Sequence, residues 1–249
     1  MAVWSIGRLS SITTIRKGSD ILMTALADPY FKVRASACSA IAQFGVSECS
    51  HSMEFERMSE NVLPVLVRLL KDGQLNKQSV AETIVLMGAQ GEQTLVNILA
   101  KEPNNNLNLR VCMVRALALS NVSNASIDFV IETLFKVARD KNAQIRKASV
   151  ISLDILRKKS MSLQDQVTYL KAKNLLPFFY RCLTDKDKQV RNSALLGISN
   201  FGPQGELMFI EGVTKEQNTQ IRIECAKGLG KIGPTTFRTL LLTIHDIHP

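Results

Sequence analysis

The 249-residue chain has few glycines, prolines and aromatic residues, and it lacks any long uncharged apolar run. Thirteen glycines and seven prolines exclude a collagen-like or proline-rich chain, and an apolar content of 45% excludes wholesale disorder. No stretch of eighteen apolar residues is free of charge, so the sequence predicts no membrane span. The first ten residues do not match the pattern of a secretory signal.

Cysteine and histidine are also scarce, and their spacing matches no metal or disulfide framework. The chain has three histidines and five irregularly placed cysteines, without a Cys-x-x-Cys pair. A zinc site needs three or four ligands, so we expect no metal, no cofactor and no catalytic centre. Free cysteines inside apolar patterns favour a reducing compartment, and we therefore expect an intracellular, cytoplasmic protein.

The basic charge is concentrated in the second half of the chain. The net charge is +9, and residues 126–249 hold 19 basic and 12 acidic residues against 12 and 10 in residues 1–125. The second half is therefore the stronger attractor for an acidic partner.

An apolar residue followed by arginine recurs along the chain and indicates an internal repeat. The arginines of these dipeptides are separated by 76, 36, 45 and 31 residues, and they are Arg34, Arg110, Arg146, Arg191 and Arg222. Because 76 is twice 38, a degenerate copy is expected between the first two, with Lys77 or Gln78 at the arginine position.

Each arginine follows a turn residue by six positions and stands at the start of an amphipathic helix. In the last copy Ile221, Cys225, Leu229 and Ile232 share one face of a helix of 3.6 residues per turn. Apolar runs of helical period precede each turn, and no segment alternates like a strand. The unit is therefore a pair of helices, and the predicted fold class is all-α.

The repeats ADPYFKVRASACSAIAQFG and TDKDKQVRNSALLGISNFG resemble the HEAT-repeat family of armadillo-like proteins. That family's unit is a helical hairpin with Asp in the turn and Val-Arg at the start of the second helix. The resemblance covers nearly the whole chain and implies a right-handed α-solenoid of stacked helical hairpins. It implies no particular function, because the family is a scaffold for many tasks.

The repeat pattern divides the chain into hairpins, half-repeats and insertions. We expect a single solenoid over 1–249. We also expect it to be a fragment of a longer solenoid, because neither end holds a complete hairpin. Its parts are a half-repeat 1–17, repeats over about 18–45, 60–90, 91–121, 124–157, 166–202 and 203–233, a half-repeat 234–249, and insertions 46–61 and 157–173.

Stacking of the repeats predicts a structural ladder of turn acids and second-helix arginines. An arginine fork can bind carboxylates and turn carbonyls of its own and neighbouring repeats. The expected ladder residues are Asp28, Arg34, Asp72, Arg110, Asp140, Arg146, Asp185, Arg191 and Arg222.

Positions five and nine residues after each repeat arginine point away from the core face of the second helix. In a HEAT-like solenoid these helices line the concave surface, so the positions form a candidate partner-binding groove, unless curvature or an insertion covers them. The candidates are Trp4, Arg8, Gln43, Leu86, Arg115, Leu119, Ile151, Ile155, Leu196, Asn200, Lys227 and Lys231.

The sequence thus predicts a non-enzymatic scaffold that binds acidic or amphipathic segments of partner proteins on its concave face. No small-molecule substrate is implied. The alternative is a nucleic-acid-binding protein that uses the basic second half, although one tryptophan and three tyrosines offer little for base stacking.

Overall fold

All regular elements in the described part of the chain are helices. The computed structural model describes residues 12–46, 53–72, 75–101, 106–121, 126–162 and 175–232. The helices are α2 (Ile12–Leu26), α3 (Phe31–Val46), α4 (Met53–Asp72), α5 (Lys77–Leu86), α6 (Ala89–Lys101), α7 (Leu107–Ala116), the 3-10 helix η2 (Leu117–Leu119), α8 (Ile127–Val137), α9 (Ala143–Ser162), α11 (Leu175–Cys182), α12 (Lys188–Ser199), α13 (Pro203–Lys215) and α14 (Thr219–Ile232). The fold is an all-α solenoid of helical hairpins, as the sequence predicts.

The chain divides into two compact units, residues 1–136 and residues 137–249. The boundary falls at the end of α8, inside the hairpin that the sequence assigns to residues 124–157. Helix α9 belongs to the second unit, where it packs along α12. Each unit is therefore described separately.

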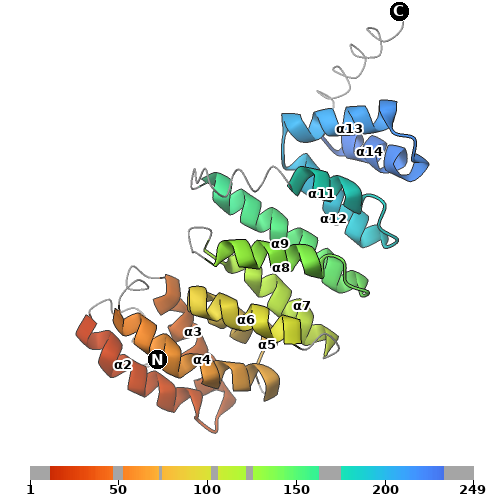
Figure 1. Ribbon diagram of the computed structural model, residues 1–249. Helices are drawn as coiled ribbons and strands as arrows, with labels where there is room; N and C mark the ends of the chain where they lie inside the picture. Colours follow the sequence, from red (N-terminus) through yellow and green to blue (C-terminus); the bar gives the residue numbers. More distant parts are fainter. Residues whose placement is uncertain are drawn as a thin grey trace, which may run out of the picture. The chain divides into compact units, whose positions relative to one another are not determined.

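The first unit is built from two layers of helices. First helices α2, α4 and α6 pack in sequence as one layer, and second helices α3, α5 and α7 pack as the other (Figure 1). Each first helix also packs against the second helix of its own hairpin. Fully buried side chains such as Leu22, Ile41, Leu66 and Ile84 fill the space between the layers. This burial of one apolar stripe per helix is what the 3.6-residue periodicity requires.

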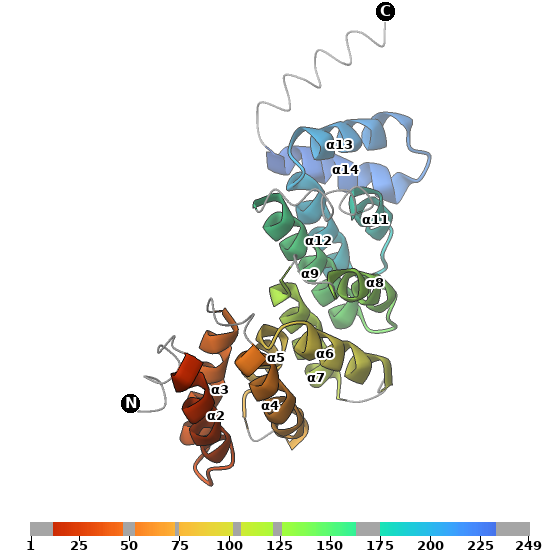
Figure 2. The same ribbon diagram turned by 60° about the vertical axis from the view of Figure 1, so that its left-hand side comes forward.

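The second unit repeats this arrangement. Second helices α9, α12 and α14 form one layer, while α11 packs on α12 and α13 packs on α14 (Figure 2). The α13–α14 hairpin is closed at Gly228, where a β-carbon would lie 2.6 Å from the ring of the fully buried Phe209. Between α12 and α13 the chain turns at Gly202, whose φ of 60° favours glycine.

Asparagine or aspartate caps the start of most second helices. The side chains of Asn142, Asp187 and Asn218 each accept a hydrogen bond from the backbone N–H two residues on, at 2.8–2.9 Å. Asn76 and Asn106 cap α5 and α7 in the same way. These caps stand four residues before the repeat arginine where one is present, so they fix where each second helix begins.

Several boundaries differ from those that the repeat pattern predicts. Helix α2 begins at Ile12, inside the expected half-repeat 1–17, and α4 begins at Met53, inside the expected insertion 46–61. Helix α9 continues to Ser162, so the start of the 157–173 insertion is helical. Residues 1–11 and 233–249, which include the rest of the predicted half-repeats, lie outside the described residues.

Candidate partner-binding groove

The degenerate second helix, α5, has a different register from the one that the sequence suggests. Its buried residues Val80, Ala81, Thr83, Ile84 and Val85 repeat the burial pattern that surrounds Arg146 in α9. This pattern places Ala81 at the arginine position instead of Lys77 or Gln78. The shift is four residues, about one helical turn, so Leu86 stays on the same helix face but at position five instead of nine.

Positions five and nine of the first unit are only partly open to solvent. Gln43, Leu86 and Leu119 are half-buried, whereas Arg115 is exposed. Leu119 ends the 3-10 helix η2 instead of standing in the α-helix that precedes it. Trp4 and Arg8 lie outside the described residues.

The same positions are exposed throughout the second unit. Ile151 and Ile155 lie on α9, Leu196 lies on α12 with Asn200 as its C-cap residue, and Lys227 and Lys231 lie on α14. The apolar members are Ile151 and Ile155, both 38% exposed, and Leu196, which is 56% exposed. The candidate residues that the structure brings together are thus those of α9 and α12.

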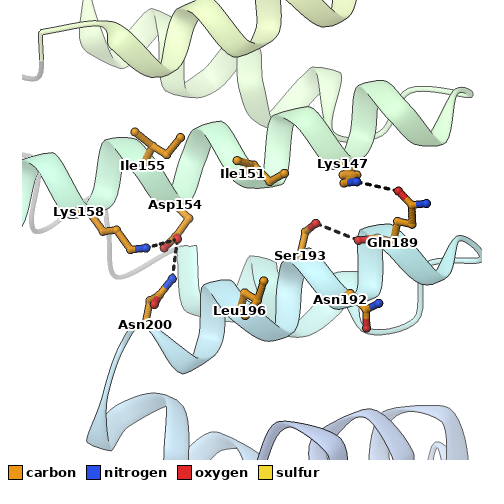
Figure 3. Close-up of a pocket in the computed structure, with 10 residues that line it drawn as sticks. All are labelled: Lys147, Ile151, Asp154, Ile155, Lys158, Gln189, Asn192, Ser193, Leu196 and Asn200. Atoms are coloured by element: carbon orange, nitrogen blue, oxygen red, sulfur yellow. Dashed lines mark hydrogen bonds and ion pairs between the residues drawn. The ribbon is translucent and has the colours of Figure 1, made fainter. Parts of the chain in front are cut away.

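A groove of about 590 Å³ runs between α9 and α12 and is lined by four of these residues (Figure 3). We call it the α9–α12 groove, and its lining is Lys147, Ile151, Asp154, Ile155, Lys158, Gln189, Asn192, Ser193, Leu196 and Asn200. In Figure 3 Ile151 and Leu196 lie in the middle, Ile155 lies toward the end that holds Asp154, Lys158 and Asn200, and Lys147 and Gln189 lie at the other end. Beneath the groove, Leu153 and Leu195 are fully buried, so the core below it is already filled.

Polar bridges cross the groove at both ends. At one end Lys147 Nζ donates to Gln189 Oε1 at 2.7 Å. At the other end Asn200 Nδ2 donates to Asp154 Oδ2 at 2.7 Å, and Lys158 Nζ lies 3.2 Å from the same oxygen. Both bridges join α9 to α12, so they hold the two helices side by side and parallel.

Asp154 also anchors a buried cation under the second end of the groove. Arg157 donates from Nε and Nη2 to Asp154 Oδ1 at 3.1 and 2.9 Å, and its side chain is 1% exposed. The guanidinium carbon of Arg157 lies 4.4 Å from the centroid of the Phe201 ring. A guanidinium over an aromatic face is stabilised by the ring quadrupole, so this contact adds to the α9–α12 attachment.

The repeat arginines bind the turns that precede them. Nη1 of Arg34, Arg146, Arg191 and Arg222 donates in each case to the backbone carbonyls six and five residues earlier, at 2.7–3.2 Å. The turn carboxylates of Asp28, Asp140 and Asp185 accept the backbone N–H two residues on. Asp72 instead ends helix α4, and Arg110 lies half-buried in α7.

Two of these arginines also reach the next repeat. Arg146 binds both carboxylate oxygens of Asp185, at 2.7 and 2.6 Å. Burial by itself raises the pKa of the Asp185 carboxyl, but hydrogen bonds from Arg146 and from the Asp187 N–H outweigh it and hold that pKa below its ordinary value.

Arg191 uses a carboxylate of the neighbouring second helix. Its Nε lies 3.0 Å from Glu224 Oε1, and Lys227 Nζ lies 3.0 Å from the same oxygen. Burial raises the pKa of Glu224, yet the hydrogen bonds from Lys227 and Arg191 keep it below its ordinary value.

Sequence reasoning assigned Asn200 to the groove but missed the other polar residues that frame it. Lys147 stands four residues before Ile151 and Lys158 three after Ile155, so the helical period contained a signal for both. Asp154 contacts Asn200, which lies 46 residues away in sequence. Arg191 on α12 contacts Glu224 on α14, the second helix of the next repeat. No local pattern predicts such pairs.

No metal or membrane feature was found in the part of the chain that the structure describes. No three His, Cys, Asp or Glu side chains there lie close enough together to hold a metal ion. No helix of the described ranges has the length and apolar character to cross a bilayer. Cys38, Cys112, Cys182 and Cys225 are free thiols.

Comparison with known proteins supports the repeat assignment. A family model described as HEAT repeat matches residues 175–205, which cover α11, α12 and the turn into α13. No curated protein matches the chain. Two crystal structures of engineered proteins resemble it, one at 14% identity over 86% of this chain and 96% of the other, with a TM-score of 0.42. The second engineered protein is 17% identical, and the match covers 96% of this chain and 66% of the engineered chain, with a TM-score of 0.43.

Proposed function

We propose that this chain of HEAT-like repeats is a non-enzymatic scaffold whose α9–α12 groove binds a segment of a partner protein. The segment carries apolar side chains that pack on Ile151, Ile155 and Leu196, and acidic side chains that face the lysines around them. Helical repeats of this kind serve as interaction surfaces, and the repeat assignment supports the scaffold role.

The observation that carries the proposal is the exposed apolar centre of the groove. Leu196 is 56% exposed, whereas Leu195 beside it in the sequence is fully buried. Three large apolar side chains that line one groove and stay 38–56% exposed are typical of an interaction site. Covering them with apolar side chains of a partner stabilises the complex through the hydrophobic effect.

The charge around the groove favours an acidic partner. Lys147 lies at one end of the groove, and Lys227 and Lys231 are exposed on the adjacent helix α14. Lys147 hydrogen-bonds a neutral amide, so no carboxylate offsets its charge in that bond. Complementary charge of this kind increases the association rate and selects against basic partners.

Nucleic-acid binding has less support. Arg146, Arg191 and Arg222 bind turn carbonyls, and two of them also bind carboxylates, so their guanidinium groups are already engaged. Binding that rests on phosphate contacts would lose about 10³–10⁵ in affinity between 50 and 200 mM salt. Titration with random duplex and single-stranded oligonucleotides across that range measures this alternative directly.

The test of the proposed function is a comparison of three versions of the chain as bait in lysate from cells that express it naturally. They are the unchanged chain, Leu196→Asp in the groove, and the matched control Leu207→Asp. Leu207 lies on α13, the first helix of its hairpin, and outside the groove. It is 58% exposed, so its exposure is close to that of Leu196. Circular dichroism melts establish that all three are folded.

We expect a partner that binds the unchanged chain and Leu207→Asp but is reduced at least tenfold on Leu196→Asp. An aspartate on an exposed surface should cost the fold about 1 kcal/mol or less, so the loss reports binding. If the captured proteins are the same for Leu196→Asp as for the unchanged chain, the groove is not the binding site.

A further inference from the structure

The α9–α12 groove is long enough to bind a short helix of a partner. Its lining on α9 runs from Lys147 to Lys158, eleven residues apart, which corresponds to about 16 Å along the helix axis. Gln189 on α12 and Asn200, the C-cap residue of α12, are also eleven residues apart. Parallel neighbouring helices with axes about 8–10 Å apart accept the side-chain ridge of a third helix between them.

Backbone hydrogen bonding favours a helix over an extended segment. An extended ligand would place its N–H and C=O groups over Ile151, Ile155 and Leu196, which offer no hydrogen-bonding atoms in their side chains. Of the three amides in the lining, Gln189 accepts from Lys147, Asn200 donates to Asp154, and Asn192 is a single side chain that cannot pair the backbone of a whole extended segment. A helix satisfies its own backbone and presents only side chains, so it meets this groove without loss of hydrogen bonds.

The apolar centre fixes the spacing of the ligand's anchors. Ile151 and Ile155 are one helical turn apart, about 6 Å along α9. A ligand helix that lies along the groove matches this spacing with two apolar residues four positions apart. Leu196 on α12 lies across the groove from Ile151, with Ile155 farther along α9 toward Lys158 (Figure 3).

The two ends of the groove differ in accessible charge. At the Lys158 end the exposed lysine is paired with the Asp154 carboxylate, which it shares with Arg157, and Arg157 itself is buried against Phe201. At the Lys147 end the groove contains a lysine and a neutral amide.

Other charged groups near the Lys147 end leave it positive. Asp187 accepts from the first N–H groups of α12, and Asp185 is paired with Arg146. Lys186 and Lys188 are exposed beside them. An acidic ligand side chain therefore belongs at the Lys147 end of the groove.

Helix dipoles set the direction of the ligand. The N-termini of α9 and α12 both lie at the Lys147 end, and they carry partial positive charge. A ligand helix antiparallel to them places its partially negative C-terminus there. The acidic residue then follows the apolar pair in the ligand sequence by about one further turn.

We propose that the partner segment, if the groove binds one as proposed above, is an amphipathic helix antiparallel to α9 and α12. Its signature is two large apolar residues four positions apart, followed one turn later by Asp or Glu. Acidic residues are intrinsically favoured at the N-terminus of a helix. Enrichment of acidic residues on the C-terminal side of the apolar pair therefore reports contact with the groove and not the ligand's own helix stability.

The experiment is a selection from a displayed library of randomised helical peptides about fourteen residues long. The full chain is the target, Leu196→Asp is the counter-target, and Lys147→Glu and Lys147→Gln are separate targets. We expect the signature to dominate the peptides that require Leu196. Peptides selected on Lys147→Glu should carry Lys or Arg in place of the acidic residue. The affinity of the original peptides for Lys147→Glu should be about fivefold to tenfold lower than for the unchanged chain, and their affinity for Lys147→Gln should lie between these two values.

The outcomes separate this inference from the proposed function. Peptides that require Leu196 but carry the acidic residue before the apolar pair, or alternate apolar residues every second position, overturn the antiparallel helix and leave the groove as the binding site. Peptides that keep their acidic residue on Lys147→Glu overturn the assigned direction. A selection in which no peptide depends on Leu196 overturns the proposed function itself.

Discussion

Removal of the buried Arg146 guanidinium should destabilise the second unit more than removal of the corresponding guanidinium of Arg222. In Arg146→Met the aliphatic stem is kept, while four hydrogen bonds are lost: two to the carboxylate of Asp185 and two to the turn carbonyls of Asp140 and Lys141. The side chains of Arg146 and Asp185 are 7% and 14% exposed, so water replaces these bonds poorly.

The magnitude follows from leaving Asp185 buried without its partner. Breaking a buried ion pair by removing one member costs about 3–5 kcal/mol. Arg222→Met is the matched control, because Arg222 binds its own turn carbonyls and, among the described residues, no carboxylate. We expect the control to cost about 1–2 kcal/mol, since only bonds within one turn are lost.

Urea unfolding followed by circular dichroism measures Arg146→Met, Arg222→Met, Asp185→Asn and the Arg146→Met/Asp185→Asn double variant. The cycle should give a coupling of about 2 kcal/mol between Arg146 and Asp185. Equal destabilisation by Arg146→Met and Arg222→Met, or a coupling below about 0.5 kcal/mol, would refute the role of this pair in joining the repeats.

Three further predictions concern the second unit. Gly228→Ala should lower the melting temperature because its β-carbon meets a buried ring at 2.6 Å, whereas Gly230→Ala, with open space around it, should stabilise α14 by about 0.5–1 kcal/mol. Leu153→Asp should unfold its repeat, because Leu153 is fully buried, while Ile155→Asp should melt within a few degrees of the unchanged chain; equal melting temperatures would show that both are core. Because the folded pKa of Glu224 lies below its unfolded value, its stabilisation is present above about pH 4.3 and lost as the pH falls through the folded pKa. The unchanged chain should therefore lose stability relative to Glu224→Gln in an acid titration of the melting temperature, and a constant difference would contradict the assignment.

Local sequence patterns were sufficient to predict the hairpins and the outward position of Ile151, Ile155 and Leu196, whereas Leu86 and Leu119 are half-buried. The six-residue interval from turn to arginine predicts the hairpin that Arg34, Arg146, Arg191 and Arg222 close through carbonyl bonds. The helical period also places Ile155 and Leu196 on the outward face, because it follows from 3.6 residues per turn alone. An intracellular location, expected from the cysteine pattern, stays a prediction.

Contacts between distant residues could not be predicted in the same way. The sequence cannot show that Arg191 binds Glu224 of the next second helix where Arg146 binds the turn residue Asp185. It also misplaced the register of α5, because without an arginine the repeat offers only its burial pattern. The length of α9 and the division at residue 136 depend on packing between helices, which no window of the sequence contains.

The most direct measurement of the groove's role is site-specific photocrosslinking. A photoreactive phenylalanine analogue replaces Leu196 in one version of the chain and Leu207 in another, and both are expressed in the cells where the chain occurs. The two positions are 56% and 58% exposed, so chance collisions should label them equally. The groove predicts a discrete crosslinked partner from position 196 that is absent from position 207. Adducts that are the same at both positions, or found only at 207, would contradict it.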